Sequence, residues 1–533
     1  MTRHGVWIVT ILSAVAGPCS AGPEWWHEAV FYEVFVRSFA DSQQGAHAND
    51  GVGDLRGLID KLDYLNDGDP STDDDLGVTA LWLMPVFQSP SYHGYDVVDY
   101  NTIDDEYGDN ALFSQLLTAC HDRGIRVVVD MIPNHTSWLH PWFVEARDPN
   151  SPKHDWYVWS DQPLTGPGAP QHEVWHDKAL DTTGQYYYGF FWHGMPDLNL
   201  RNPAPTKALY DIAKLWLGRG VDGFRLDAAR HLIEDGVIFE NTPETIAWLE
   251  KYNAYIHSLN EHAFIVGEIW DTTEQVKRYV PGALDSAFEF STCFAIEEGL
   301  NSGSAVPIQA ALTAAWEAFR GEQSTFIGNH DMDRVSNRLG ADPARMACAA
   351  TILMTTPGVP FIYYGEEIGM SGAKPDPDIR TPMQWTPDPA TAGFTTGQPW
   401  RAINPDVAQV NVETEGASPT SLLSHYRKLV RLRLDHPGLN VGDFKPLDAG
   451  DGRVLAFTRR RSADHLLVVI NVSADPIDAG WGVDAGALGV APTDAPTELL
   501  HTATVTPPDS VEQEDWRPIG TLAPRTGYVI SLP

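Results

Sequence analysis

Short runs of apolar, β-branched and aromatic residues alternate with longer amphipathic segments along most of the chain. This order is typical of parallel strands joined by crossover helices. Eight runs are expected to be strands, and eight parallel strands close a (β/α)8 barrel, also called a TIM barrel. The predicted strands are Phe31–Ser38, Ala80–Pro85, Arg126–Ile132, Gly223–Asp227, Phe264–Ile269, Ser286–Phe290, Thr325–Asn329 and Pro360–Tyr364.

The segment between the third and fourth predicted strands is about ninety residues long, far more than a crossover helix needs. Residues 135–199 within it are rich in Trp, Tyr, Pro and His and have little periodicity. This composition predicts a subdomain inserted after strand three, beside the barrel mouth. Apolar residues follow helical spacing over Ser421–Leu434, which is expected to be the last barrel helix.

The pattern changes after His436, where apolar and polar residues begin to alternate. Alternation over Val454–Arg459, His465–Val472 and Gly527–Leu532 predicts antiparallel strands and a small C-terminal β-sandwich. The predicted domains are therefore a signal peptide (1–21), a catalytic barrel (22–134 and 200–436), an inserted domain (135–199) and a C-terminal domain (437–533).

The N-terminus has the order of an export signal. Arg3 gives a basic start, Trp7–Ala16 is an apolar run, and Cys19–Ala21 are small residues suited to peptidase cleavage. A lipoprotein anchor at Cys19 is the alternative, although Pro18 fits that interpretation poorly. The sequence predicts a secreted or periplasmic protein with no membrane span in its mature form.

The formal charge is −36, from 72 acidic and 36 basic residues. Nucleic acids and anionic membranes are themselves negative, so a neutral substrate is the more compatible partner. Either a saline habitat or ordinary export would account for so acidic a surface. The cysteines Cys120, Cys293 and Cys348 are too few and too widely spaced for a disulfide framework, and we expect a monomer.

In a barrel of this kind, the reacting groups lie at the carboxyl ends of the strands. Arg225 and Asp227 are two apart in the fourth predicted strand, so both side chains should enter the mouth. A guanidinium favours an ionised carboxylate, which a glycosidic nucleophile must be.

Glu268 follows the neighbouring strand. Close to other carboxylates and partly desolvated, it should keep its proton to higher pH than a free glutamate, which suits a general acid and base. Double displacement needs the two carboxyls about 5–5.5 Å apart, a separation that adjacent strand ends can supply. A single acidic residue after a strand is often only a helix cap or an ion pair.

Four segments at strand ends together resemble the conserved regions of the α-amylase family of glycoside hydrolases. They are Asp130–His135, Gly223–His231, Val266–Trp270 and Ile327–Asp331. The resemblance implies a retaining mechanism with Asp227 as nucleophile and Glu268 as general acid/base. It also implies that Asp331 is the third carboxylate, which binds sugar hydroxyls and stabilises the transition state.

The resemblance extends to residues that would contact substrate. In Ser91–Asp96, Tyr95 resembles a tyrosine that stacks on the reacting glucose, and Asp96 is expected to pair with Arg380. Arg230 and His231 replace a Lys-His pair that contacts sugar beyond the cleaved bond. For His135 and His330 a buried core role is the alternative, and for the pair of Asp96 and Arg380 a structural clamp. The implied binding residues are His93, Tyr95, Asp96, His135, Arg225, Arg230, His231, His330 and Arg380.

Met195–Asn199 and Lys61–Pro70 resemble segments of the group intermediate between oligo-1,6-glucosidases and neopullulanases. The expected activity is hydrolysis of α-1,4 bonds in starch and maltooligosaccharides. The alternatives are an exo-acting α-glucosidase or oligo-1,6-glucosidase, a transglycosylating relative such as trehalose synthase, a non-catalytic transporter subunit, and a pure carbohydrate-binding module.

A structural calcium ion is also implied by the resemblance. Its ligands would lie in the loop after strand one, at Asp41, Asp50, Val52 and Asp54, because calcium prefers hard oxygen ligands. Residues 44–48 are an insertion in this loop, and a solvated acidic loop is the alternative. A second calcium between barrel and insertion would use Asn134 and the carbonyl of His231.

Overall fold

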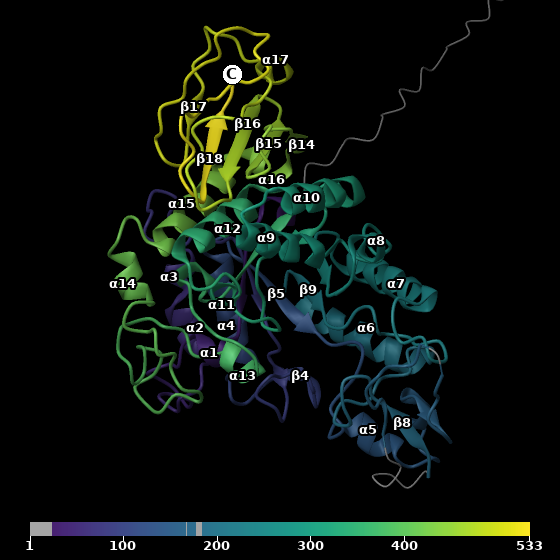
Figure 1. Ribbon diagram of the computed structural model, residues 1–533. Coiled ribbons are helices and arrows are strands. Elements are labelled where there is room, and N and C mark those ends of the chain that lie inside the picture. The colour runs from purple at the N-terminus through teal and green to yellow at the C-terminus, as the bar shows by residue number, and fades with distance from the viewer. Residues whose placement is uncertain (1–23, 167, 177–183) are drawn as a thin grey trace, which may run out of the picture.

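The computed structural model describes residues 24–166, 168–176 and 184–533. Eight parallel strands form one sheet in the order β11-β10-β9-β5-β2-β1-β13-β12, so the predicted (β/α)8 barrel is confirmed (Figure 1). The predicted signal peptide, residues 1–21, lies outside the described residues. The barrel strands are β1 Phe31–Val34, β2 Ala80–Leu83, β5 Arg126–Met131, β9 Gly223–Leu226, β10 Phe264–Gly267, β11 Ser286–Ala287, β12 Ser324–Thr325 and β13 Val359–Tyr363.

The two ends of this sheet meet and close the ring. A single parallel bridge joins Phe288 to Ser324. The hydroxyl oxygens of Ser286 and Ser324 lie 2.7 Å apart, and the Glu289 amide donates to the Ser324 carbonyl at 2.9 Å. Short strands therefore suffice to complete the barrel at this seam.

Several strands end earlier than the sequence predicts. The first predicted strand runs to Ser38, but β1 ends at Val34 and Val36–Phe39 forms the short helix α1. The seventh runs to Asn329, whereas β12 ends at Thr325. Phe35, Val36 and Phe39 are all buried. Apolar residues indicate burial and not strand structure as such. Here the loops at the barrel mouth are buried as well as the strands, so the apolar runs extend beyond the strand ends.

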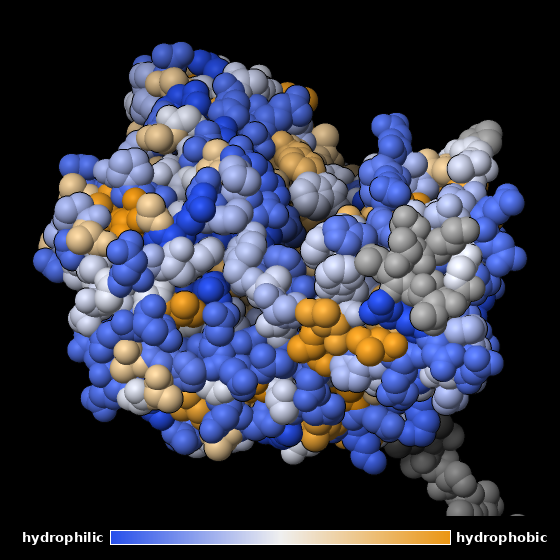
Figure 2. All heavy atoms as spheres, turned by 90° about the horizontal axis from the view of Figure 1, so that it is seen from below, coloured by the Kyte–Doolittle hydropathy of each residue, from blue (hydrophilic) through white to orange (hydrophobic). Residues whose placement is uncertain are grey.

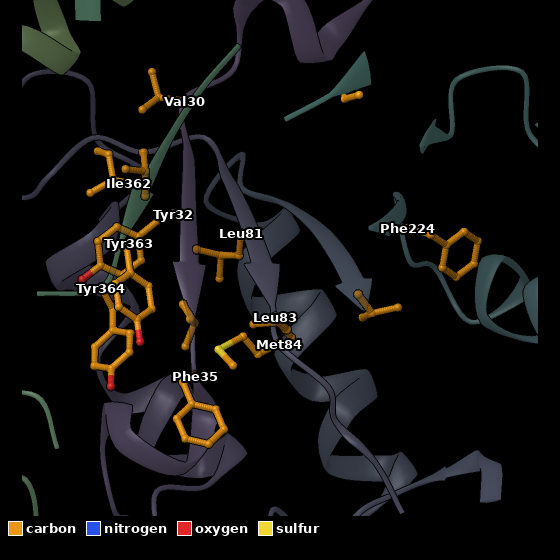
Figure 3. Packing of buried hydrophobic residues seen from close by; sticks show 14 of the residues in the cluster. Val30, Tyr32, Phe35, Leu81, Leu83, Met84, Phe224, Ile362, Tyr363 and Tyr364 are labelled. Atoms are coloured by element: carbon orange, nitrogen blue, oxygen red, sulfur yellow. The ribbon is translucent and has the colours of Figure 1, made fainter. Parts of the chain in front are cut away.

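Alternate residues of each strand face opposite sides of the barrel wall. Phe31, Trp82 and Phe361 belong to the cluster that fills the interior. Their neighbours in sequence belong to a larger cluster between the sheet and the surrounding helices. Figure 3 shows Tyr32 and Leu81 in this outer cluster. The interior is therefore a packed core, and only the ends of the barrel can hold a substrate.

The barrel helices begin at clear capping signals. Asn202, Thr242 and Asp342 each cap a helix with a side-chain oxygen, and a proline follows each of them. Ser421 caps α15, which agrees with the predicted last barrel helix. The longer helices are α2 Leu55–Asp60, α4 Asn110–His121, α6 Pro203–Gly218, α7 Pro243–Leu259, α9 Phe290–Ser302, α10 Val306–Phe319, α12 Pro343–Thr355 and α15 Leu422–Asp435.

Short elements make up most of the connections. Within the described ranges, no helix combines the length and apolar character that crossing a membrane requires. The short elements are α1 Val36–Phe39, α3 Leu62–Leu65, α8 Thr273–Val276, α11 Val335–Arg338, α13 Asp376–Ile379, α14 Val412–Gly416, α16 Pro437–Val441, η1 Trp25–Glu28, η2 His154–Trp156, η4 Glu366–Ile368, β3 Phe87–Gln88 and β4 Asp99–Ile103.

The long segment between β5 and α6 forms a small unit of its own beside the barrel, at the lower right of Figure 1. Its helix is α5 Pro141–Ala146. The strands β6 Trp159–Ser160, β7 Trp175–His176 and β8 Tyr186–Tyr188 form an antiparallel sheet in the order β6-β8-β7. The Phe143 ring lies 5.0 Å from the Tyr187 ring. Aromatic packing of this kind explains why the segment lacks a clear periodicity.

The C-terminal domain contains a five-stranded antiparallel sheet in the order β14-β15-β16-β18-β17. One face packs on the barrel helices and the other on a second cluster around Trp481 and Trp516. In the described chain, turns and two isolated bridges supply the second layer of the predicted sandwich. The domain contains β14 Asp443–Leu447, β15 Val454–Arg461, β16 Asp464–Asn471, α17 Ala485–Leu488, β17 Thr497–Glu498 and β18 Thr526–Ser531.

Candidate active site

The carboxyl ends of the barrel strands surround a cavity of about 390 Å³. Figure 2 shows the molecule from below the view of Figure 1, and hydrophilic residues cover most of that face. The cavity brings together seven of the residues singled out in the sequence: His93, Tyr95, His135, Asp227, Glu268, Asp331 and Arg380. Phe191, Trp192, Met195 and Asp376 complete its lining.

A second cavity of about 490 Å³ adjoins the first. Both are lined by Phe191, Glu268 and Asp331, so the carboxylates stand where the two cavities meet. Arg230 and His231 line this second cavity, together with Phe190, Ala228, Trp270 and Lys374. A chain of sugar rings could therefore extend on either side of the carboxylates.

Arg225 connects the carboxylates at the centre of the site. Its Nη1 donates to Asp227 Oδ1 at 2.7 Å and to Asp130 Oδ1 at 2.8 Å. Its Nη2 donates to Glu268 Oε2 at 2.5 Å. One fully buried guanidinium therefore spans the gap between Asp227 and Glu268, which lie on the same side of the barrel mouth.

Burial is the main influence on the pKa values of Asp227 and Glu268, and it raises both. Arg225 opposes this rise at each carboxyl, while Asp331 adds to it. The sequence predicts a raised pKa for Glu268, as the structure has it. For Asp227 the sequence stresses the stabilising guanidinium, but in the structure the cost of desolvation exceeds that stabilisation.

Asp331 behaves in the opposite way. Burial raises its pKa, but the nearby positive charges of His330 and Arg380 outweigh burial and lower the pKa below its usual range. Arg380 Nη2 lies 2.8 Å from Asp331 Oδ1, and His330 Nε2 lies 2.9 Å from Asp331 Oδ2. The site thus combines a carboxylate held ionised with two others that keep protons more readily.

The predicted pairing of Asp96 with Arg380 is wrong. Arg380 pairs with Asp331, and its Nη2 lies 3.5 Å from Asp376. The Asp96 carboxylate instead accepts hydrogen bonds from the hydroxyls of Ser89 and Ser91. Two hydroxyls in the same loop satisfy Asp96 locally, which leaves the guanidinium free for the carboxylates of the cavity.

Tyr95 is held by histidines on the wall of the first cavity. Its hydroxyl lies 2.7 Å from His330 Nε2, and its ring stacks on the His330 ring at 5.6 Å and 15°. His135 Nε2 lies 3.2 Å from the Tyr95 carbonyl. Burial lowers the pKa of His135 to about 4, so this histidine is neutral at ordinary pH. The flat face of Tyr95 suits the apolar face of a sugar ring.

The second cavity has an aromatic wall from the inserted segment. The Phe190 ring stacks on the His231 ring at 4.1 Å and 23°. Burial lowers the pKa of His231 to about 3, so its ring is neutral. Arg230 forms two ion pairs, one with Glu240 at 3.2 Å and one with Asp271 at 3.4 Å. This side of the site therefore presents rings and hydrogen bonds, with its positive charge compensated.

Several residues of the site were not assigned a role from the sequence. Asp130 is the penultimate residue of β5 and accepts a hydrogen bond from Arg225, and a charged residue within an otherwise apolar strand was the available signal. Phe191 and Trp192 are 44% and 42% exposed at the cavity, which is high for large aromatic side chains. They come from the segment rich in aromatic residues, but the sequence does not show which of those rings reach the mouth.

The loop predicted to hold calcium does not fit an ion as it stands. Asp41 accepts hydrogen bonds from the amides of Asn49 and Gly51, at 3.0 and 2.9 Å. Asp54 accepts from Ser42 and Gly57, and caps α2. Asp50 accepts from the Val52 amide at 2.9 Å. Hydrogen-bond donors occupy both carboxylate oxygens of Asp41 and of Asp54, which would have to face the ion.

Asn134, predicted to bind a second calcium ion, has an oxygen atom that is available to an ion. Its Oδ1 atom and the Oδ2 atom of Asp197 are buried and have no hydrogen-bond partner within the described structure. Unpaired hard oxygens are what a calcium ion would use. Across the described ranges, no group of three or more His, Cys, Asp or Glu residues has the spacing of a metal site. Further ligands would therefore have to be backbone carbonyls or water.

A closed parallel barrel with three carboxylates around a cavity of this size defines the class of the protein as a barrel enzyme that acts on glycosidic bonds. Comparison with known proteins narrows the class. The family model described as "Alpha amylase, catalytic domain" matches residues 33–442.

Curated relatives match most of the chain. Alpha-amylase 3 of Dictyoglomus thermophilum is 39% identical over 473 residues, which cover 87% of this chain and 88% of the relative. An oligo-1,6-glucosidase of Parageobacillus thermoglucosidasius is 32% identical over 84% of this chain and 90% of the relative. Trehalose synthase/amylase TreS of Mycobacterium tuberculosis is 34% identical over 87% of this chain and 84% of the relative.

Among solved structures, the alpha-amylase from H. orenii superposes with a TM-score of 0.81 at 37% identity, covering 95% of this chain and 99% of that one. The chain therefore belongs to the α-amylase family of glycoside hydrolases. These relatives, at 39%, 32% and 34% identity, are named for different activities, so membership of the family leaves the exact specificity open.

Proposed function

We propose that the protein is a retaining α-glucan hydrolase that cleaves α-1,4-glucosidic bonds of starch and maltooligosaccharides by double displacement. The observation that carries the proposal is the shared guanidinium of Arg225, which binds Asp227 and Glu268 at the edge of a sugar-sized cavity. Two carboxyls held by one guanidinium at the edge of a substrate cavity can respectively attack and protonate the same glycosidic bond.

In the first step, an Asp227 oxygen attacks the anomeric carbon while Glu268 donates its proton to the departing oxygen. The bond to the leaving sugar breaks and a covalent glycosyl-enzyme forms. In the second step, Glu268 takes a proton from water, which attacks the anomeric carbon and releases Asp227. The raised pKa of Glu268 supports its role as proton donor.

Asp331 would stabilise the positive charge that develops on the sugar ring, because it is the carboxylate held ionised by Arg380 and His330. Tyr95 would stack beneath the same ring. His93 and His135 line the cavity beside it, and His93, whose Nδ1 accepts from the Tyr95 amide, would donate from Nε2 to a sugar hydroxyl. The second cavity would then hold the sugar that leaves or accepts.

The closest test of the chemistry is a single variant, assayed on two kinds of substrate. Glu268→Gln keeps the shape of the side chain but removes the proton donor, so we expect kcat to fall about 10²–10⁴-fold. An activated substrate with a good leaving group needs no proton donor and should restore the first step. A variant that cleaves starch at the parent rate would reject the proposal.

The second candidate function is exo-cleavage or transglycosylation, which the oligo-1,6-glucosidase and trehalose synthase among the relatives favour. A time course of products from starch, pullulan, cyclodextrin and maltotriose separates the candidates. Early loss of starch viscosity supports endo-hydrolysis. Release of glucose alone, or of products longer than the substrate, would replace the α-amylase assignment with one of the others.

Three further proposals concern export, oligomeric state and calcium binding. We propose that residues 1–21 are removed on export, that the mature chain is a monomer, and that Asn134 and Asp197 hold a calcium ion that stabilises the junction of barrel and insertion. N-terminal sequencing of the exported chain and sedimentation test the first two. A chelator should lower the thermal unfolding temperature of the parent but not that of Asn134→Leu.

A further inference from the structure

Glu33 is a charged residue within strand β1, and its neighbours in the strand are apolar or aromatic and buried. Residues two apart share a face of a strand, so Glu33 points into the barrel with Phe31, while Tyr32 and Val34 pack outward. Its side chain is only 2% exposed. A buried carboxylate is costly unless it is paired, and Glu33 must therefore have a partner inside the barrel.

The partner is His330. Glu33 Oε1 lies 2.5 Å from His330 Nδ1, and both side chains are almost completely buried. On the opposite edge of the imidazole, Nε2 lies 2.7 Å from the Tyr95 hydroxyl and 2.9 Å from Asp331 Oδ2. The ring therefore links a carboxylate in the barrel interior to one that lines the substrate cavity.

Two carboxylates on opposite sides of one imidazole favour a proton on each nitrogen. Burial alone would lower the pKa of His330, but Asp331 and Glu33 outweigh it and raise the pKa to about 9. Arg380 contacts His330 only at the backbone carbonyl, at 2.9 Å, and not at the imidazole ring. The more distant groups that interact with the imidazolium are Asp130, Asp227 and Glu268.

His135 provides an internal comparison. It is as deeply buried as His330 and lines the cavity that Asp331 also lines. Its ring contacts the Tyr95 carbonyl and the Asn134 amide, both of which are uncharged. The difference between the two histidines is the pair of carboxylates at His330, and Glu33 is the member of that pair that lies away from the substrate.

We propose that Glu33 is a positioning residue of the active site, whose carboxylate holds the His330 imidazolium so that His330 in turn fixes Asp331 and Tyr95 against the sugar. Glu33 itself does not touch the substrate. Removing its charge should make the ring lose one proton at lower pH, and the neutral ring can donate to only one of its two sides. The effect on sugar binding rests on the proposed glucan-cleaving function, whereas the effect on His330 does not.

The first experiment follows the His330 ring resonances by NMR during a pH titration. In the parent, the midpoint should lie near 9. Glu33→Gln keeps the shape and the acceptor oxygen, and should lower the midpoint by about 1–3 pH units. The matched control is Glu367→Gln, since Glu367 is also fully buried but bonds Tyr32 and Tyr64 instead. In this control the His330 midpoint should not move.

A parent midpoint at or below the ordinary value for histidine would overturn the proposal without any variant. So would a folded Glu33→Gln protein whose midpoint equals that of the parent, or a Glu367→Gln protein that shifts as far. Circular dichroism and thermal unfolding of each variant establish that it is folded before its titration is compared.

The second experiment measures binding of maltopentaose by calorimetry in the Glu268→Gln background, which removes the titration of Glu268. Binding should weaken as pH rises through the His330 midpoint. With Glu33→Gln added, that weakening should begin about one unit lower or more. Equal pH profiles would overturn the role in positioning. If neither protein binds maltopentaose at any pH, the proposed substrate is wrong, and the NMR titration still decides the role of Glu33.

Discussion

Buried arginines occupy two regions of this molecule that differ in what surrounds the charge. At the barrel mouth, Arg225 lies against the carboxylates of Asp130, Asp227 and Glu268. At the junction of the barrel and the C-terminal domain, Arg433 and Arg459 donate to backbone carbonyls instead. All three side chains are at most 1% exposed.

The two regions shift the guanidinium pKa in opposite directions. Burial lowers the pKa of Arg433 to about 9. Burial also lowers the pKa of Arg459, and the neighbouring charge of Arg433 lowers it further. At Arg225, burial acts in the same sense, but the charges led by Asp130 outweigh it and the pKa rises above its usual range.

The contrast shows how one residue type serves chemistry in one place and structure in another. The partners of Arg225 can gain and lose protons, so the charge of Arg225 affects when they do so. The partners of Arg433 include Met354 and Thr356 at the C-terminal end of α12, where the carbonyl dipoles favour a cation. These dipoles do not titrate, so this region holds the barrel and the C-terminal domain together without a partner that exchanges protons with Arg433.

The largest effect is expected from Asp227→Asn, which removes the nucleophile and should lower kcat by about 10⁴-fold or more. The fold should persist, because the amide can still accept from Arg225. Steady-state kinetics on soluble starch check the rate. The matched control is Asp211→Asn on the exposed surface of α6, where the carboxylate pairs with Lys207 and with no other described residue. A residual rate close to that of the control would remove Asp227 from the mechanism.

Arg225→Met should lower kcat/KM by about 10²–10³-fold, because it removes the charge that orients both carboxyls. Arg225 lowers the pKa values of Asp227 and Glu268. Without it both pKa values rise, so both limbs of the pH profile of kcat/KM should move to higher pH. A profile that keeps its limbs while the rate falls would show that Arg225 acts through packing alone.

Arg433→Met should affect stability and not chemistry. Removing its hydrogen bonds leaves buried carbonyls without donors, and we expect the free energy of unfolding to fall by about 2–4 kcal/mol. Denaturant unfolding measures the loss. Activity per folded molecule and the pH profile should match those of the parent, in contrast to Arg225→Met. A shifted profile in Arg433→Met would contradict the separation of the two regions.

Phe191→Ala should have the smallest effect, since its ring lines both cavities but carries no charge or proton that the reaction uses. We expect KM to rise by tenfold or less, equivalent to about 1.4 kcal/mol or less, with kcat little changed. The control is Leu139→Ala, an exposed apolar residue of the same inserted segment that lines neither cavity. Equal changes in the two variants would mean that Phe191 has no specific role.

Much of the fold follows from local patterns in the sequence. The apolar runs predict every barrel strand, and the capping signals at Asn202, Thr242 and Asp342 agree with the starts of the helices. The strand ends were less predictable. Phe35 and Val36 are as buried as the residues of β1, although the chain has already turned into α1.

For the active site, the positions of the carboxylates could be predicted from the sequence, but their partners could not. Asp227 and Glu268 stand directly after apolar strands, Asp331 follows the apolar run beyond β12, and the cavity brings all three together. The choice of partner for Arg380 could not be predicted, because it depends on whether Asp96 finds donors in its own loop. Similarly, the acidic loop around Asp41 has suitable ligand types for calcium, but its backbone amides turn inward and satisfy the carboxylates.

By itself, the sequence determined the alternation of strands and helices, the number of strands in the barrel and the polar residues at the carboxyl ends of those strands. Each of these features depends on neighbours along the chain. Only the tertiary structure decided which charges meet. Glu33 and His330 are 297 positions apart, and only barrel closure brings their atoms within hydrogen-bond distance. Coulomb energy depends on separation and burial in space, and neither can be obtained from distance along the chain.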